Sequence, residues 1–470
     1  MTETNSKKFY LEPPITWASR LIFFELCAAI VLTTLGYGTV HPSLVGLFWV
    51  SAGLLVILWA ADAFWSGALR FSKSWLQIPL VGAILFGIVQ MIPFGFANVV
   101  NVSGIARTIS LDPYQTQLAV WHFAALLIFF AAMLSFIDSP QRLKFLALFI
   151  TIFGFVFAFY AIIQNLLDPG RIYGIYERPY LQPFGSFVNK HNFAAYIEMC
   201  LAVPLGLLFS GAVGREKRLL YLTAVGLMGI ALVMSGSRGG LVALLAELIF
   251  LAVIATKNRT PGALFIKIGL AAALVAAIVV GTILIGGDST LTRIAETASS
   301  KDPTSSRLQI WATTIEVIKQ NPLLGAGWGA FSVAYTQFDP LNGRERVEQS
   351  HNDYLQILAD AGIVGAVLSI GFLFFLFRDA WRRIGSKDDF RRGVAIGALA
   401  GCFAILVHSL FDFVLHTTAV SLLFLTLASL ATLNGRVEAE ETERPKRRRK
   451  ASVTSIDSKR RKSEAPALTD

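Results

Sequence analysis

The sequence predicts an all-α, polytopic membrane protein of about 12 transmembrane helices, with one long extracytoplasmic helical loop between the ninth and tenth spans. Two observations support this fold class. Hydrophobic residues make up 54% of the 470-residue chain and charged residues only 15%, with a mean hydropathy of +0.60, whereas charged residues make up about 25% of a soluble domain. The apolar residues also gather in runs of about the length that a helix needs to cross a bilayer.

Each expected span is an apolar run, and several runs lie at the short end of the spanning range. Their expected bounds in chain order are 21–38, 42–64, 75–94, 117–137, 145–165, 193–212, 219–236, 240–256, 264–286, 361–377, 394–412 and 418–434.

The distribution of basic residues orients these spans. Cytoplasmic loops are enriched in Lys and Arg, and with a cytoplasmic N-terminus 30 of the 41 Lys and Arg residues fall on the inside. We therefore expect both termini in the cytoplasm. The chain then divides into a cytoplasmic arm, nine spans, an extracytoplasmic loop, three spans and a disordered basic cytoplasmic tail, with bounds 1–20, 21–286, 287–360, 361–434 and 435–470.

The cysteines and the two ends of the chain add further expectations. All three cysteines lie in apolar runs, so no disulfide framework is implied. The N-terminal arm is basic and has no small-residue cleavage site before the first span, which indicates a signal anchor. The basic clusters of the tail, Arg444–Lys450 and Lys459–Lys462, are expected to meet anionic lipids of the inner leaflet rather than nucleic acid.

The longest polar interval, Asp288 to Asp360, carries a candidate base. Ser350 and Asp353 have the spacing of an N-terminal helix cap, which predicts His351 at the first helical position. The helix dipole there favours a neutral imidazole, the form that accepts a proton. The plainer alternative is a histidine in a capping region.

A second capped helix is expected earlier in the same interval. Ser306 and Gln309 have the spacing of a capping box, and apolar residues recur at helical spacing until Asn321 and Pro322. Arg307 then lies in the first turn, where the dipole disfavours a cation. The position suggests an anionic partner, with an ordinary surface arginine as the alternative.

Cations also gather in the outer loop 166–192, although the positive-inside rule disfavours them there. Arg171 and Arg178 lie in this loop, and an anionic ligand is the simplest reason for them. The loop ends in a polar run of further candidate binding residues, Asn189, Lys190, His191 and Asn192.

The turn Ser235–Gly240 between two spans contains one charged residue, Arg238. Glycines let backbone amides approach a ligand closely, and amides at a helix start bind anions. The alternative is an arginine that extends to the membrane interface from a helix end.

Two other features concern hydrogen bonding and metals. His408 and Asp412 are four residues apart and could pair on one helical face, as a structural contact rather than a ligand pair. The six histidines lack the spacing of a zinc motif, and the outer segments hold no carboxylate cluster suited to Mg²⁺. We expect no metal and no cofactor.

These residue types together describe one chemistry. Two guanidinium groups can bind a diphosphate and stabilise it as a leaving group, and a neutral histidine can activate a hydroxyl. The sequence therefore predicts group transfer from a lipid-linked diphosphate to a hydroxyl acceptor at the outer membrane face.

Four motifs resemble the O-antigen ligase and polymerase superfamily over roughly residues 185–380. They are Gly185-Ser-Phe-Val-Asn-Lys-His-Asn-Phe-Ala, Ser237-Arg-Gly-Gly, Arg307-x3-Trp311 followed by Asn321-Pro-Leu-Leu-Gly-x-Gly-Trp-Gly-x-Phe331, and His351-Asn-Asp-Tyr-Leu-Gln. The Lys190-His191 pair departs from the family pattern, which leaves the acceptor preference open.

The resemblance implies a glycan donor linked to undecaprenyl diphosphate, in a bacterial inner membrane. Arg238 and Arg307 match the diphosphate-binding arginines of the family, and His351 matches its proposed base. Asp353 and Tyr354 of the last motif are candidate substrate-binding residues.

Several alternatives stay open at this point. A ligase is slightly favoured over a polymerase, which would use a second lipid-linked unit as acceptor. A transporter or flippase is the rival class, but such proteins place ionisable groups near the bilayer midplane, often within inverted repeats. Apart from Glu198 and Glu247 the sequence shows neither feature. A scaffold in an envelope complex is the third class.

Overall fold

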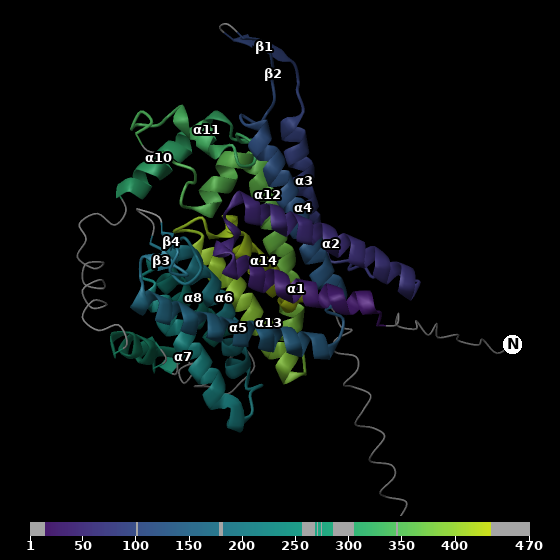
Figure 1. The fold of residues 1–470 in the computed structure, drawn as a ribbon, viewed down its shortest axis with the longest axis vertical. Coiled ribbons are helices and arrows are strands. Elements are labelled where there is room, and N and C mark those ends of the chain that lie inside the picture. The colour runs from purple at the N-terminus through teal and green to yellow at the C-terminus, as the bar shows by residue number, and fades with distance from the viewer. Residues whose placement is uncertain are drawn as a thin grey trace, which may run out of the picture.

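The computed structural model describes residues 15–99, 102–177, 182–255, 268–269, 271–273, 275–284, 305–344 and 346–433. These residues form a helical bundle with two short β-hairpins (Figure 1). Most of the arm 1–20, the start of loop 287–360 and the tail 435–470 lie outside the described residues. The first elements are α1 (Trp17–Leu35), η1 (Tyr37–Thr39), α2 (Pro42–Ser66), α3 (Gln77–Met91), β1 (Phe96–Val99), β2 (Val102–Ala106), α4 (Pro113–Phe136), α5 (Pro140–Leu167), β3 (Arg171–Ile172) and β4 (Tyr176–Glu177).

The second half of the chain contributes the centre of the bundle and the helices at one of its ends. Its elements are α6 (Lys190–Ser210), η2 (Arg215–Lys217), α7 (Arg218–Met234), α8 (Arg238–Ile254), α10 (Ser305–Gln320), α11 (Phe331–Thr336), α12 (Asp353–Ile384), α13 (Asp389–His408), η3 (Val414–His416) and α14 (Thr418–Thr432). In Figure 1, α10 and α11 lie at the end of the molecule from which the β1–β2 hairpin projects.

Eight helical segments of the described residues are long and apolar enough to cross a membrane, namely α1, α2, α4, α5, α6, Arg215–Met234, α12 and α13. The apolar helices α3, Ala271–Leu284 and α14 are shorter, and α8 has 17 residues. The chain is thus an all-α, multi-pass membrane protein. The number of twelve crossings and the place of the long loop stay predictions.

Reporter fusions test the predicted orientation. Reporters placed after Lys301 and Gly343 are expected to be active outside, and those after Lys217 and Lys387 inside, because the basic loops alternate along the chain. Paired alkaline phosphatase and green fluorescent protein fusions measure this, since each is active on one side only. An inside signal at Lys301 would place the candidate site described below on the wrong face of the membrane.

Two deeply buried helices, α6 and α13, pack closely through small residues. The 18-residue apolar segments of α6 and α13 are 89% and 72% buried. Small residues recur every fourth position on each helix, which lets two membrane helices approach closely. They meet as the pairs Ala202–Gly401, Gly206–Gly397 and Ser210–Gly393.

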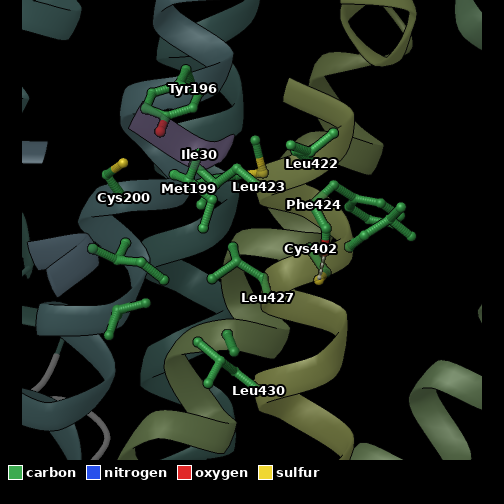
Figure 2. Close-up of a cluster of buried hydrophobic side chains, with 14 of the residues drawn as sticks. Ile30, Tyr196, Met199, Cys200, Cys402, Leu422, Leu423, Phe424, Leu427 and Leu430 are labelled. Carbon is green, nitrogen blue, oxygen red and sulfur yellow. Dashed lines mark hydrogen bonds between the residues drawn. The ribbon is translucent and has the colours of Figure 1, made fainter. Parts of the chain in front are cut away.

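The helix α14 packs beside α6 and α13 and completes this core. Figure 2 shows side chains of the three helices gathered with Ile30 of α1 in one apolar cluster. Cys402 of α13 lies with its Sγ 4.0 Å from the carbonyl oxygen of Phe424 in α14. All three cysteines are buried and free, which agrees with the absence of a predicted disulfide framework.

Enlarging Gly397 is expected to push α6 and α13 apart. A Cβ atom on the facing Gly206 would already lie 2.3 Å from Gly397 Cα, so Gly397→Leu should cost about 1–3 kcal/mol, the usual effect of overpacking. The thermal unfolding midpoint in lipid nanodiscs measures this. The matched control is Gly226→Leu in α7, where a Cβ would meet nothing within 4 Å. Equal midpoints for the two variants would contradict the close packing.

The helix α12 is broken at Gly362, and a turn from the long loop fills the break. Gly362 has φ 58° and ψ −149°, a conformation that a side chain would strain. The turn that follows α10 binds both edges of the break, because Ile363 N donates to Pro322 O at 2.9 Å and Gly327 N donates to Asp360 O at 2.9 Å. The helix α10 ends at Gln320, as Asn321 and Pro322 predict, and its loop is thereby fixed to the start of α12.

Candidate active site

A buried carboxylate, Asp412, is the centre of a polar cluster between α13 and α14. Its side chain is 1% exposed. His351 Nδ1 lies 3.2 Å from Asp412 Oδ1, and Arg307 Nη2 lies 3.2 Å from Oδ2. His191 Nδ1 lies 3.8 Å from Oδ2. Three candidate residues that are far apart in the sequence therefore meet at one carboxylate.

The surroundings of Asp412 keep it ionised. Burial alone would raise the pKa of Asp412, but the hydrogen bond with His351, together with nearby His191 and Arg307, holds this pKa well below its usual range. The group is therefore an anion at neutral pH, and it can fix the orientation of an imidazole.

Arg307 holds the turn that presents Asp412. It lies in the first turn of α10, as the sequence predicts. Its Nη1 donates to Phe411 O at 2.7 Å while Nη2 pairs with Asp412. The turn itself closes on the end of α13, where Phe411 N donates to His408 O at 2.8 Å. The Arg307 side chain is 28% exposed, and these contacts leave other N–H donors of the guanidinium for a ligand.

His351 lies just before α12 rather than within it. The N-cap is Asn352, whose side chain accepts from the backbone N–H of Tyr354 and Leu355, so the expected cap at Ser350 and the first helical position of His351 are both wrong. His351 has a positive φ of 53°. Asn352 also donates from Nδ2 to Leu410 O at 2.9 Å. This tertiary contact ties the start of α12 to the turn that carries Asp412.

The starts of α6 and α8 lie beside the same cluster. Asn189 caps α6 and accepts from His191 N at 2.8 Å, and Ser237 caps α8 and accepts from Gly240 N at 3.2 Å. His191 Nδ1 and Ser237 Oγ are 2.9 Å apart and join the two starts. The first residues of these helices are the cations Lys190 and Arg238. Two positive helix ends therefore lie near Asp412, as the sequence suggested for α8 alone.

A second histidine–carboxylate pair lies beside the first. His416 Nδ1 lies 3.0 Å from Asp353 Oδ1, and Asp353 Oδ2 accepts from Ser409 Oγ at 2.7 Å. Burial by itself would lower the pKa of His416, but the hydrogen bond and charge of Asp353 and the charge of Asp360 raise it. Each of the segments 351–353 and 412–416 therefore contributes one histidine and one aspartate. His351 pairs with Asp412, and His416 pairs with Asp353.

His408 has a different partner from the one that its spacing suggests. Because α13 ends at His408, Asp412 does not lie one turn further along the same helix. His408 Nδ1 instead lies 3.1 Å from Glu198 Oε2, with both side chains fully buried.

The other candidate binding residues lie in different surroundings. Lys190 Nζ bonds Gln182 Oε1 and would lie 3.9 Å from a Cβ on Gly236, beside the α8 turn. Arg171 instead pairs with Glu177 at 3.1 Å on the exposed β3–β4 hairpin. Asn192 is buried, with 4% of its surface exposed. The hydroxyl of Tyr354 donates to Leu406 O at 2.7 Å. Arg178 lies outside the described residues.

Sequence reasoning missed Asp412 and His416 as site residues. The signal that could have found them is the short run from Phe411 to His416, which places a carboxylate and a histidine between the last two spans at the predicted outer face. Among the described residues, no group of three or more His, Cys, Asp or Glu side chains is arranged to hold a metal ion.

A family model matches part of the chain that contributes to this site. Residues 223–370 match a family model described as O-Antigen ligase, and this interval contains Arg238, Arg307 and His351. No curated protein matches the chain. The match supports the resemblance of the motifs in this multi-pass membrane protein to the O-antigen ligase and polymerase superfamily.

Proposed function

We propose that this protein is a ligase that transfers a glycan from an undecaprenyl-diphosphate-linked donor to a hydroxyl acceptor at the outer face of a bacterial inner membrane. The family match supports a membrane enzyme of the ligase or polymerase type. The observation that carries the proposal is the convergence of His351, Arg307 and His191 on the buried Asp412.

His351 is the general base of this proposal. A hydrogen bond from Nδ1–H to Asp412 leaves the lone pair on Nε2, where a proton from the acceptor hydroxyl can be received. Its side chain is 34% exposed, so a substrate can reach the ring. As His351 takes up the proton, the ionised Asp412 stabilises the imidazolium that forms.

In this proposal the diphosphate is bound by Arg307, which pairs with Asp412, and by Lys190 and Arg238 at the starts of α6 and α8. Arg307, Arg238 and Lys190 outnumber the single carboxylate, so the cluster keeps a positive charge for an anionic ligand. The N-termini of α6 and α8 add backbone N–H donors at their positive ends. A planar guanidinium can also hold two phosphate oxygens at once.

The reaction balances without a further reactant. The acceptor oxygen forms a bond to the anomeric carbon of the glycan, and its proton passes to His351 Nε2. The bond between that carbon and the diphosphate oxygen breaks, and the electron pair leaves with the lipid diphosphate. Negative charge that builds up on this oxygen is stabilised by the arginines, a contribution made mainly in the transition state.

A reconstituted assay tests the proposal. Purified protein in lipid nanodiscs is incubated with a lipid-linked glycan, first alone and then with a glycolipid acceptor, and the products are separated by size. One increment that requires the acceptor supports a ligase. A ladder from donor alone would show a polymerase, and movement of the donor across a vesicle membrane without a new product would show a flippase. We expect transfer to persist in excess EDTA; a strict need for a divalent cation would contradict the metal-free mechanism.

A further inference from the structure

The candidate site contains a second histidine, His191, to which the proposed mechanism gives no role. His191 is the second residue of α6. Its Nδ1 lies 3.8 Å from Asp412 Oδ2, while His351 Nδ1 lies 3.2 Å from Asp412 Oδ1. One ionised carboxylate therefore has an imidazole beside each of its oxygens. In such an arrangement one imidazole can receive a proton while the other supplies one.

Contacts at Nδ1 hold the ring of His191. Ser237 Oγ lies 2.9 Å from this atom and also accepts from Gly240 N, so the ring is fixed to the start of α8. The negative charge of Asp412 favours a proton on Nδ1, because the partner of one ring nitrogen determines the tautomer. The lone pair is then on Nε2. The side chain is 22% exposed, so a ligand can reach the ring.

The charged and titratable groups around His191 come from several parts of the chain. They are Lys190 of α6 itself, Arg238 after the Ser237 cap of α8, Arg307 of α10, His408 at the end of α13, and Asp412, which His191 shares with His351. Asp412 already pairs with Arg307, so it offsets little further positive charge. A second proton on the His191 ring is therefore opposed while the cations have no ligand.

A bound diphosphate reverses this balance. The three cations carry three positive charges and Asp412 carries one negative charge, and the two negative charges of a diphosphate diester would cancel the difference. An anion close to an imidazole favours its protonated form. With Nδ1 already protonated, the added proton goes to Nε2, which becomes a donor to a phosphate oxygen. When the bond to the glycan breaks, the diphosphate gains a third negative charge that this proton can neutralise.

We propose that His191 is a second catalytic histidine, which takes up a proton when the diphosphate binds and gives it to the diphosphate oxygen that leaves the glycan. His351 receives the proton of the acceptor hydroxyl in the same reaction. His351 is 34% exposed and returns that proton to water, while the next donor brings a proton from water to His191, so atoms and charges balance over one turnover. This inference rests on the proposed function and gives a role to a residue of the Lys190-His191 pair, which departs from the family pattern.

Proton uptake on donor binding tests the first half of the inference without any transfer. The probe is glucose linked to farnesyl diphosphate, a diester whose phosphates do not titrate near neutral pH, and no acceptor is added. Isothermal titration calorimetry of the full-length protein in nanodiscs, repeated in buffers of different ionisation enthalpy, counts the protons taken up. We expect up to about one proton per donor bound at about pH 6.5. Binding without proton uptake from about pH 5.5 to 7.5 would overturn the inference.

A matched pair of substitutions assigns the proton. His191→Gln keeps an amide that can bond Ser237 but cannot take up a proton, and it should remove most of the uptake. His41→Gln is the control for loss of an imidazole, because the ring of His41 packs against Tyr37 and Tyr176, with centroid distances of 5.5 and 5.4 Å. Equal uptake by His191→Gln and the wild type would show that another group takes up the proton and would overturn the assignment.

The transfer rate tests the second half of the inference. A proton donor must be protonated to act, so the wild-type single-turnover rate should fall as pH rises above neutral, and His191→Gln should lose this fall. The variant should also be slower by about 10²–10⁴-fold, the range for a positioned acid or base. A purely structural role would lower the rate without changing its pH dependence. A normal rate, or a slow rate with the wild-type pH dependence, would overturn the role of His191 as an acid.

The outcomes separate this inference from the proposed function. Proton uptake through His191 without glycan transfer in the reconstituted assay would remove both the function and the acid role, and would leave a proton-linked diphosphate site. Transfer by a wild-type protein that binds its donor without proton uptake would remove this inference and leave the function.

Discussion

The Asp412→Asn variant is expected to lose about 10²–10⁴-fold in the rate of glycan transfer, the range for a positioned general base. Asparagine cannot stabilise an imidazolium as a carboxylate does, and it can present an N–H to His351 Nδ1, which would favour the wrong tautomer. His351→Ala should cost a similar factor while the donor still binds. Single-turnover rates with saturating donor measure both effects.

The double variant His351→Ala/Asp412→Asn tests whether the two residues act together. Because His351 and Asp412 act as one unit, removing both should cost about as much as the more damaging single change, rather than the product of the two. Multiplying effects would show that the two residues act independently. Glu177→Gln on the exposed β4 strand is the control for expression and handling. Near-normal transfer by His351→Ala would show that His351 is not the general base and has only a structural role before α12.

Replacing either arginine is expected to remove both donor binding and transfer. Arg238→Ala and Arg307→Ala should each cost about 10²–10³-fold, which corresponds to roughly 2.7–4 kcal/mol of transition-state stabilisation. Lysine should restore only part of this because it cannot bond two phosphate oxygens in one plane. Equilibrium binding of the lipid-linked donor, measured beside the transfer rate, separates these variants from His351→Ala.

The two arginines should differ in their structural effects. Arg307 also holds the backbone at Phe411, so Arg307→Ala should loosen the turn before α14, whereas Arg307→Lys keeps one donor there. Lys319→Ala, further along the same helix and exposed, is the matched control for loss of a cation. Full activity in both alanine variants at normal protein levels would exclude the diphosphate clamp.

The sequence predicts helix ends well where one local signal dominates. Asn321 and Pro322 end α10, because backbone geometry at this site depends on neighbouring residues. The helix α8 starts at Arg238 after the Ser237 cap, two residues before the expected span 240–256. The start of α12 was mispredicted because Ser350 and Asn352 are both good caps. Asn352 is the N-cap and also donates a hydrogen bond to Leu410 O. This contact joins two segments that are far apart in the sequence, so no local pattern predicts it.

The partners of the buried charges could not be predicted for the same reason. The i, i+4 spacing of His408 and Asp412 suggests a pair only if the helix continues, but α13 ends at His408. The buried pairs are chosen by the packing of α6, α12 and α13, which brings Glu198 to His408 and His351 to Asp412. The sequence predicts the histidine and the arginines of the candidate site. The central position of Asp412 depends on the tertiary fold and could not be predicted.

Two histidine–aspartate pairs, His351 with Asp412 and His416 with Asp353, join the segment before α12 to the segment between α13 and α14. His351 lies just before α12 and Asp353 is its first residue, so a ligand that shifts this short stretch of backbone alters the geometry of both pairs. Whatever factor donor binding applies to the affinity for acceptor, acceptor binding must apply to the affinity for donor, because coupling free energy is reciprocal. Measuring one affinity with the other site filled would reveal whether this enzyme senses that both substrates are present before the sugar moves.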